Sequence, residues 1–324
     1  MMENNTASPV NCNIDERIAN IAIPILYFLL FFPGLLLNIL AGWISLKLPE
    51  KSTFKVYLKN LIASDLLMTL TFPLMAASGL QDAPMGLREF SCRYSTVLFY
   101  MSMYISILLM GLISLDRFFK IVMSPRRFFL QNLTFSRALS TSVWVIMFCS
   151  MALPTMILTN KKATSTGSEY CATQKSESGR KLHKAVTAAC LVLFSIVSAL
   201  ILVSYICITK RVLQSYRDSK SSNENVPKKT KARVFIILAV FLICFVPYHV
   251  TRIPYTLVPT DVCKKAAFRV AKELLLWLSS TNVCLDPLIY IFLSKSFRER
   301  LIEMGICGRA FHMLNPSNSE MTSV

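Results

Sequence analysis

The sequence predicts an all-α membrane protein, in which a seven-transmembrane helix bundle is followed by a short amphipathic eighth helix. Hydrophobic residues make up 54% of the 324 residues, and they are concentrated in seven long runs that hold almost no charge. The runs contain 18 to 26 residues and cover 21–46, 60–81, 94–115, 138–160, 185–209, 234–251 and 274–294. About 20 apolar residues in a helix cross the hydrocarbon core of a bilayer, so each run can span it once.

Seven crossings divide the chain into four regions. We expect an extracellular N-terminus over 1–17, a transmembrane domain over 18–294, an amphipathic helix over 295–307 and a cytoplasmic tail over 308–324. The loops and tail on one side carry 21 of the 35 Lys and Arg residues, and basic loops stay in the cytoplasm. The N-terminal region lacks the apolar core of a cleavable signal peptide, so the first helix is expected to act as the insertion signal.

The net charge of +17 bears on the kind of ligand. On this topology the outer side holds 14 Lys and Arg residues against 9 Asp and Glu residues, an excess that the rule for cytoplasmic loops does not explain. A basic outer mouth favours an anionic ligand. The alternative is a lysine-rich loop surface that is simply solvated.

The cysteines fall into three groups. Five lie inside apolar runs and are expected to be core residues, namely Cys149, Cys190, Cys207, Cys244 and Cys284. Four fall in outer segments, where oxidising conditions allow disulfides, namely Cys12, Cys92, Cys171 and Cys263. Spacing alone leaves three pairings of these four open. Cys307, on the basic side, is a palmitoylation candidate, and Asn4 in an Asn-Asn-Thr sequon is a glycosylation candidate.

Polar residues inside the apolar runs predict a buried polar site. Asp65 lies within the second run, and an ionised carboxylate in the membrane needs a polar cavity or a partner. Other helices could supply the polarity from Asn38, Ser106, Asn282 and Asp286. We expect either a hydrated cation site, able to hold Na⁺ at Asp65, or a static hydrogen-bond network, and the two can coexist. The three histidines show no metal-ligand spacing, so no other metal or cofactor is expected.

Prolines lie inside three of the runs, as Pro73, Pro154 and Pro247. Proline removes a backbone hydrogen bond and kinks a helix. In the sixth run Phe241 and Phe245 stand one turn apart beside Pro247, so the cytoplasmic half of this helix could swing about the kink. The alternative is a kinked helix with no further role.

Four motifs stand in order along the chain, namely Asn38 in GLLLN, Asp65 in LIASDLL, Asp116-Arg117-Phe118 and Asp286-Pro287-Leu288-Ile289-Tyr290. Over residues 18–307 their order and spacing resemble the rhodopsin-like G-protein-coupled receptors. The stretches Phe241–His249 and Arg252–Tyr255, with Lys272-Glu273, resemble the purinergic nucleotide receptors within that class. The details are most similar to the branch that senses ADP or UDP-sugars, and within it to the ADP receptors.

The resemblance implies a plasma-membrane receptor that is not an enzyme, with a nucleotide diphosphate, above all ADP, as ligand and an inhibitory G protein as partner. It also implies two disulfides, Cys92–Cys171 and Cys12–Cys263. The implied ligand-binding residues are Tyr100, Lys175, His183, His249, Arg252, Tyr255 and Lys272. Of these, Arg252, Lys175 and Lys272 could converge on a diphosphate through charge-assisted hydrogen bonds.

Simpler roles remain open for some of these residues. Lys272 could pair with Glu273 or extend to the headgroups, Tyr100 could pack in the core, and His183 could cap its helix. The chain also departs from the branch, which usually has Trp before His183 and Asn at position 187. Here Leu182 and Thr187 stand at these positions, which bears on the identity of the base more than on the phosphate site.

The resemblance also implies residues for activation and G-protein coupling, namely Asp116, Arg117, Phe118, Tyr205, Phe245, Pro247, Asp286, Pro287 and Tyr290. We expect Asp116 to hold Arg117 at rest, and Arg117 to contact the G protein once released. The alternatives are a receptor of the same fold for a UDP-sugar or a lysophospholipid, and a membrane transporter. Transporters usually carry internal repeats, and the sequence shows none.

Overall fold

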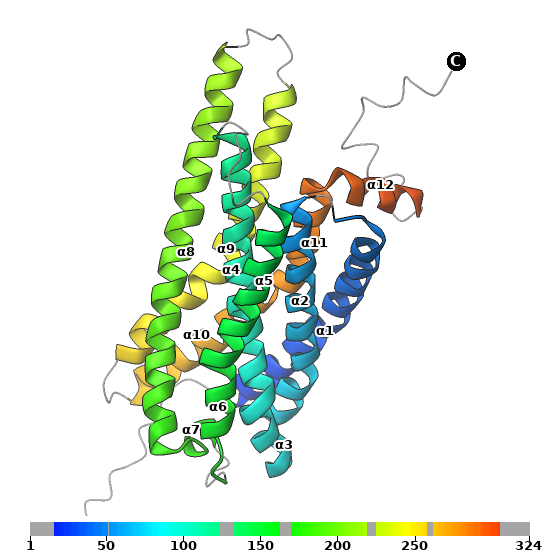
Figure 1. Cartoon of the computed structure of the whole chain (residues 1–324). Helices are drawn as coiled ribbons and strands as arrows, with labels where there is room; N and C mark the ends of the chain where they lie inside the picture. The colour runs from blue at the N-terminus through cyan, green and yellow to red at the C-terminus, as the bar shows by residue number, and fades with distance from the viewer. Residues whose placement is uncertain are drawn as a thin grey trace, which may run out of the picture.

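A computed structural model of the chain describes residues 16–50, 52–123, 132–162, 170–218, 225–257 and 262–304. In these residues the regular structure is helical, apart from one isolated antiparallel bridge between Thr159 and Lys175. Seven of the described helical spans are long and apolar enough to cross a membrane, and they pack side by side as one bundle (Figure 1). The predicted all-α seven-helix architecture is therefore confirmed.

The helices follow one another along the chain as α1 (Glu16–Lys47), α2 (Thr53–Gly79), α3 (Met85–Phe90), α4 (Thr96–Ile121), α5 (Leu133–Met147), α6 (Leu153–Leu158), α7 (Tyr170–Thr173), α8 (Glu177–Asp218), α9 (Asn225–Leu257), α10 (Val262–Ser280), α11 (Asn282–Leu293) and α12 (Lys295–Glu303). Two π-helical turns make longer spans continuous. Ser91–Ser95 joins α3 to α4, and Phe148–Ala152 joins α5 to α6. The seventh span combines α10 and α11.

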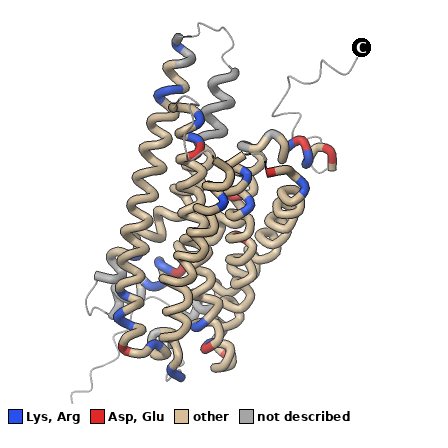
Figure 2. The backbone as a smooth tube through the Cα atoms, in the orientation of Figure 1, with Lys and Arg blue, Asp and Glu red and all other residues tan. Residues whose placement is uncertain are grey.

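Most spans are longer than the apolar runs that predicted them. The third run covers 94–115, whereas the span covers Met85–Ile121. A charged residue ends an apolar run, but the helix continues because the headgroup region accepts charges at either end of a transmembrane segment. In Figure 2 the Lys and Arg residues gather toward the two ends of the bundle, and its long middle part is mostly uncharged.

Helix α4 lies at the centre of the bundle. In the most apolar stretch of its span 72% of the residues are buried, against 22% for the fourth and fifth spans. The fully buried side chains of Met103, Tyr104 and Leu109 show how tightly its neighbours enclose it. The side chains of α4 are therefore held in place by the neighbouring helices.

The apolar cysteines divide between core and surface. Cys190 and Cys244 are buried, as predicted, and Cys207 and Cys284 are half-buried. The expectation of a core residue is wrong for Cys149, which is exposed. An apolar run cannot distinguish these cases, because a membrane helix is apolar on its lipid-facing side as well as on its packed side.

Helix α1 approaches α11 closely at Gly34. A Cβ atom at this position would lie 2.9 Å from Val283 Cγ2 and 3.4 Å from Thr69. One turn along α1, Asn38 Nδ2 donates to the carbonyl oxygens of Gly34 (2.9 Å) and Val283 (2.6 Å). The missing side chain thus allows the backbones to come near enough for Asn38 to join the two helices.

The amphipathic eighth helix is shorter and more buried than expected. Helix α12 ends at Glu303 rather than at 307, and its apolar residues Phe297 and Leu301 are buried in the core of the bundle. The Ser294 hydroxyl caps the helix by accepting from the Phe297 amide (3.3 Å). The helix thus packs on α1 and α11.

Candidate functional site

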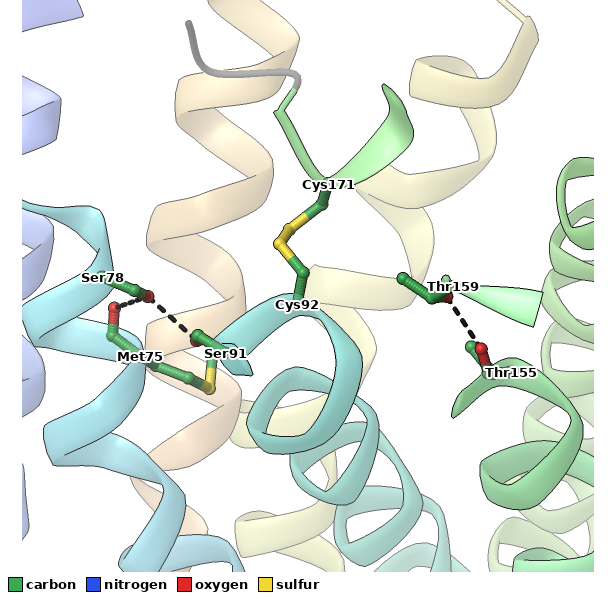
Figure 3. The surroundings of a disulfide bond; sticks show 7 residues. All are labelled: Met75, Ser78, Ser91, Cys92, Thr155, Thr159 and Cys171. Carbon is green, nitrogen blue, oxygen red and sulfur yellow. Dashed lines mark hydrogen bonds between the residues drawn. A yellow bond between two sulfur atoms is a disulfide. The ribbon is translucent and has the colours of Figure 1, made fainter. Parts of the chain in front are cut away.

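The Cys92–Cys171 disulfide fixes the loop that follows α6 to one end of the bundle. Its Cα atoms are 5.5 Å apart, and Figure 3 shows Cys171 of the loop directly joined to the start of the third span. The loop returns along the end of α6, where the Lys161 amide donates to the Gln174 carbonyl oxygen at 3.0 Å. The implied first disulfide is confirmed, and it places Lys175 over the bundle.

Several predicted positions lie outside the described residues. They are Asn4, Cys12, Cys307 and the side chains of Tyr255 and Cys263. The second implied disulfide, the glycosylation candidate and the palmitoylation candidate therefore stay predictions.

Two predicted ligand-binding cations, Arg252 and Lys272, lie within electrostatic reach of a third, Lys175. Burial, together with the positive charges of Arg252 and Lys272, lowers the pKa of Lys175 to about 8. Lys272 Nζ forms an ion pair with Glu273 at 2.8 Å, which is the simpler role that the sequence left open for Lys272. The exposed side chain of His183 lies in the field of the same three cations. The structure thus brings together a cluster that attracts an anion with several negative charges.

Arg252 is oriented by hydroxyl groups from three helices. Its Nη1 donates to the hydroxyls of Tyr248 (2.9 Å) and Tyr104 (3.3 Å), and its Nη2 donates to Thr187 Oγ1 (3.1 Å). The guanidinium also lies 5.5 Å from the ring centroid of Tyr100 and 5.6 Å from that of Tyr248. These contacts leave the guanidinium charge without an ionic partner in the described part of the chain, while its direction is fixed.

His249 lies below Arg252 and is buried. Its Nε2 lies 3.2 Å from the Tyr104 hydroxyl and its Nδ1 lies 2.8 Å from the Phe245 carbonyl oxygen. The imidazole stacks on the Phe194 ring with a centroid distance of 3.7 Å. The structure therefore places His249 as a support for Tyr104, one layer deeper than the cations.

Sequence reasoning missed Tyr104 and Tyr248 as site residues. Tyr104 lies four residues after Tyr100, and Tyr248 lies four residues before Arg252, so each shares a helix face with a predicted site residue. That spacing could have identified them. It could not have shown that the Thr187 hydroxyl accepts a hydrogen bond from Arg252, because that contact joins α8 to α9.

The polar site halfway down the bundle joins four of the five predicted residues, Asp65, Ser106, Asn282 and Asp286, and adds Tyr290. Asp65 accepts hydrogen bonds from Ser106 (3.2 Å), Asn282 (3.5 Å) and Tyr290 (3.2 Å). Asn282 also donates to Asp286 at 3.4 Å. Asn38 lies beside this group without bonding to either carboxylate, since its amide nitrogen is used on α1 and α11.

This site offers oxygen ligands to a small hard cation. The two carboxylates are fully buried, and Asn282 Oδ1 and Asp286 Oδ1 have no hydrogen-bond partner in the described part of the chain. A monovalent ion would satisfy both oxygens and offset one of the two negative charges that the carboxylates carry when ionised. Nowhere in the described ranges do three or more His, Cys, Asp or Glu residues form a group that could hold a metal ion.

At the end of the third span, the predicted pair between Asp116 and Arg117 is wrong. The Asp116 carboxylate accepts from the Thr53 hydroxyl and from Lys120 Nζ (2.8 Å). Arg117 lies over the Phe54 ring, with its Cζ atom 4.1 Å from the ring centroid. Lys120 reaches the carboxylate because it lies one turn after Asp116 on the same face of α4.

The remaining predicted activation residues are distributed along the bundle. Tyr205, Phe245 and Tyr290 are buried in the core, whereas Phe118 is half-buried. Pro247 and Pro287 lie inside α9 and α11 respectively. The structure therefore does not gather these residues into one site: the Phe245 carbonyl oxygen lies 2.8 Å from His249 Nδ1, whereas the Tyr290 hydroxyl donates to Asp65 in the polar site.

Comparison with known proteins gives one consistent result. Residues 21–290 match the family described as the 7 transmembrane receptor (rhodopsin family). The human purinoceptor 13 is 44% identical over 294 residues, which cover 90% of this chain and 83% of the relative. The bovine purinoceptor 14 is 42% identical, with coverage of 90% and 87%. The mouse G-protein coupled receptor 87 is 39% identical, with coverage of 90% and 82%.

Proposed function

Because the chain belongs to the rhodopsin family of seven-transmembrane receptors, and within it to the purinergic receptors, we propose that its ligand is an extracellular nucleoside diphosphate, with ADP first. As a member of this family the protein is a multi-pass receptor of the plasma membrane that signals through a G protein. It is not an enzyme, and family membership removes the transporter alternative.

The observation that carries the proposal is the cluster of Lys175, Arg252 and Lys272. A diphosphate presents several charged oxygens, and charge-assisted hydrogen bonds from Arg and Lys are the strongest that such oxygens receive. Arg252 is oriented in advance by Tyr104, Tyr248 and Thr187, which lowers the entropic cost of binding. The ligand would displace Glu273 from Lys272.

The base has weaker support than the phosphates. The half-buried ring of Tyr100 borders the cluster and offers an aromatic face for stacking. The Thr187 oxygen already accepts a hydrogen bond from Arg252. It therefore does not offer the base the polar contact that an Asn at this position would offer. A UDP-sugar or a lysophospholipid therefore remains the alternative in the same site, because each carries phosphate.

Activation is proposed to run from Arg252 and Lys272 to the cytoplasm. A ligand that draws the outer ends of α9 and α10 together would tilt α9 about Pro247, move its cytoplasmic half outward, and open the way for a G protein of the inhibitory class to reach Arg117. The ligand produces this shift only by binding the open state more tightly than the closed one. This scheme places the N-terminus outside the cell.

We propose Na⁺ as the ion at Asp65. Its support is the buried pair of carboxylates together with two oxygens, Asp286 Oδ1 and Asn282 Oδ1, that have no hydrogen-bond partner in the described part of the bundle. An ion held there by Ser106, Asn282 and Asp286 would favour the arrangement in which these helices stay close together.

The proposed ligand class is tested by G-protein activation in cells that express the chain, challenged with ADP, UDP-glucose and lysophosphatidylserine in parallel. We expect ADP to activate at the lowest concentration, and Arg252→Ala to raise its half-maximal concentration about 30-fold or more at equal surface expression. Lys181→Ala is the matched control, since Lys181 is an exposed cation of the same outer region, paired with Glu177. If UDP-glucose or lysophosphatidylserine activates the receptor and ADP does not, the proposal of ADP as the ligand is wrong.

A further inference from the structure

Both oxygens of the Asp116 carboxylate accept hydrogen bonds, and neither bond comes from Arg117. One oxygen accepts from the Thr53 hydroxyl, and the other accepts from Lys120 Nζ at 2.8 Å. Lys120 Nζ also donates to Thr53 Oγ1 at 2.8 Å, so the three side chains form a closed triangle between α2 and α4. The Asp116 side chain is only 2% exposed, against 32% for Lys120. A buried carboxylate needs a cationic partner, and here Lys120 is that partner.

Arg117 is the second cation near this carboxylate, but it forms no hydrogen bond with it. The two residues are close enough to interact electrostatically, yet the guanidinium lies over the Phe54 ring. The buried Nε of Arg117 has no hydrogen-bond partner within the described ranges. Two adjacent cations thus compete for one buried acid, and the loser is held by a cation–π contact, which is weaker than a charge-assisted hydrogen bond.

Other basic residues at this end of the bundle are engaged elsewhere. Lys59 Nζ and Arg137 Nη2 pair with Glu50 at 2.8 and 2.9 Å, and Lys59 beside Glu50 holds the pKa of that carboxyl below its usual value. Lys55 donates to the Pro49 carbonyl oxygen at 3.3 Å. In this part of the structure the competition at Asp116 is therefore between Lys120 and Arg117.

We propose that Lys120 is a positioning residue, which occupies Asp116 and thereby keeps Arg117 available to the G protein before any ligand binds. This inference rests on the proposed contact between Arg117 and the G protein. Removing the Lys120 ammonium leaves the Asp116 carboxylate without a cation, and Arg117 then turns from the Phe54 ring to pair with it. Lys120 thus sets how readily the ligand-free receptor engages its G protein.

The test is a mutant cycle on the purified full chain in lipid nanodiscs. The quantity measured is the half-saturating concentration of a nucleotide-free G-protein heterotrimer, of whichever class wild type binds best. Lys120→Met is expected to raise this concentration about fivefold, and Lys120→Arg is expected to restore it. In an Asp116→Asn background, Lys120→Met is expected to change it less than about twofold. Lys55→Met serves as the control for loss of a positive charge at the same end.

Each outcome has a definite meaning. An equal loss from Lys120→Met in both backgrounds would show that Lys120 touches the G protein directly, and no loss in either would show that it has no role; both overturn the inference. If Arg117→Ala leaves binding unchanged, the proposed role of Arg117 fails instead. The nucleotide proposal is separate, because no ligand is present in this assay.

Discussion

Arg252 is the side chain on which the proposed ligand site is built. Three hydroxyl groups and two aromatic rings orient it, and Lys175 lies within electrostatic reach of its charge. Lys272 differs, because an acidic neighbour already holds it. A ligand must therefore compete with Glu273 for Lys272, whereas it finds Arg252 in position.

Glu273→Gln is expected to strengthen nucleotide binding. Loss of the carboxylate releases Lys272 for the diphosphate and removes a like charge from the site, so we expect about a threefold lower Kd for ADP, measured with labelled ligand on purified receptor. Glu177→Gln is the control, since its pair with Lys181 is exposed. A weaker affinity in Glu273→Gln would mean that Glu273 itself binds the ligand.

Binding is expected to depend on pH through Lys175. Its pKa is lowered to about 8 by burial and by Arg252 and Lys272, so the lysine is charged below that pH and loses its proton above it. A bound diphosphate favours the charged form, and binding above the pKa therefore requires proton uptake. We expect the Kd for ADP to rise about tenfold from pH 7 to pH 9.

Lys175→Arg is the matched variant for this pH dependence, because arginine stays charged throughout the range. Its Kd is expected to stay nearly constant, while any titration of the ligand itself would affect both proteins equally. The same rise in Lys175→Arg would exclude Lys175 as the titrating group.

At this scale the sequence identifies charged residues better than their partners. Arg252, Lys175 and Lys272 could be proposed because their types and positions match a family pattern. The hydroxyls that orient Arg252 come from three helices. Whether Lys120 or Arg117 pairs with Asp116 depends on the side-chain conformations of the two cations. Such contacts follow from packing across helices, which spacing along one helix cannot show.

Among the elements, α1 and α11 offer a direct test of helix packing. Gly34→Ala would place a methyl group 2.9 Å from Val283 Cγ2, which is too close for a carbon contact. We expect the midpoint of thermal unfolding to fall by about 2–4 °C, the effect of mild overpacking in a protein of this size. Static light scattering or a thiol-reactive dye on purified receptor would measure it.

Two further variants sharpen this prediction. Gly34→Ala combined with Val283→Ala removes the clashing methyl groups and is expected to recover part of the loss. Gly86→Ala is the control, since a Cβ atom there meets nothing within 4 Å. The fall in the unfolding midpoint of the double variant is compared with the sum of the falls in the two single variants. A larger fall than that sum would show that the clash with Val283 is not the cause.

The existence of the spans could be predicted because a charge-free run of about 20 residues has few other stable environments. Their ends could not, since Met85–Ile121 continues well past its apolar stretch at both ends. The same reason applies to α12. Its amphipathic pattern indicated an apolar face, but the pattern did not say that Phe297 and Leu301 pack into the core of the bundle.

Across the whole molecule, the polar site lies between the cation cluster and the cytoplasmic triangle, so an ion bound there would affect both. We expect Na⁺ at about 150 mM, compared with choline at equal ionic strength, to raise the half-maximal concentration of ADP about threefold. Choline keeps the screening of the phosphate contacts constant. The measurement is G-protein activation in isolated membranes.

Asp65→Asn is expected to abolish this difference between Na⁺ and choline, because it removes one of the two carboxylates. Thr71→Val is the control, since the Thr71 hydroxyl donates to the Met68 carbonyl oxygen in its own helix. A sodium effect of the same size in Asp65→Asn would place the ion elsewhere.

The central claim is that the cations at the outer end bind a diphosphate, and the affinity of the purified receptor for ADP and for AMP tests it most directly. We predict that wild type binds ADP at least about tenfold more tightly than AMP, and that the ratio falls to nearly one in Arg252→Ala but not in Lys181→Ala. An unchanged ratio in Arg252→Ala, or equal binding of ADP and AMP by wild type, would contradict the account.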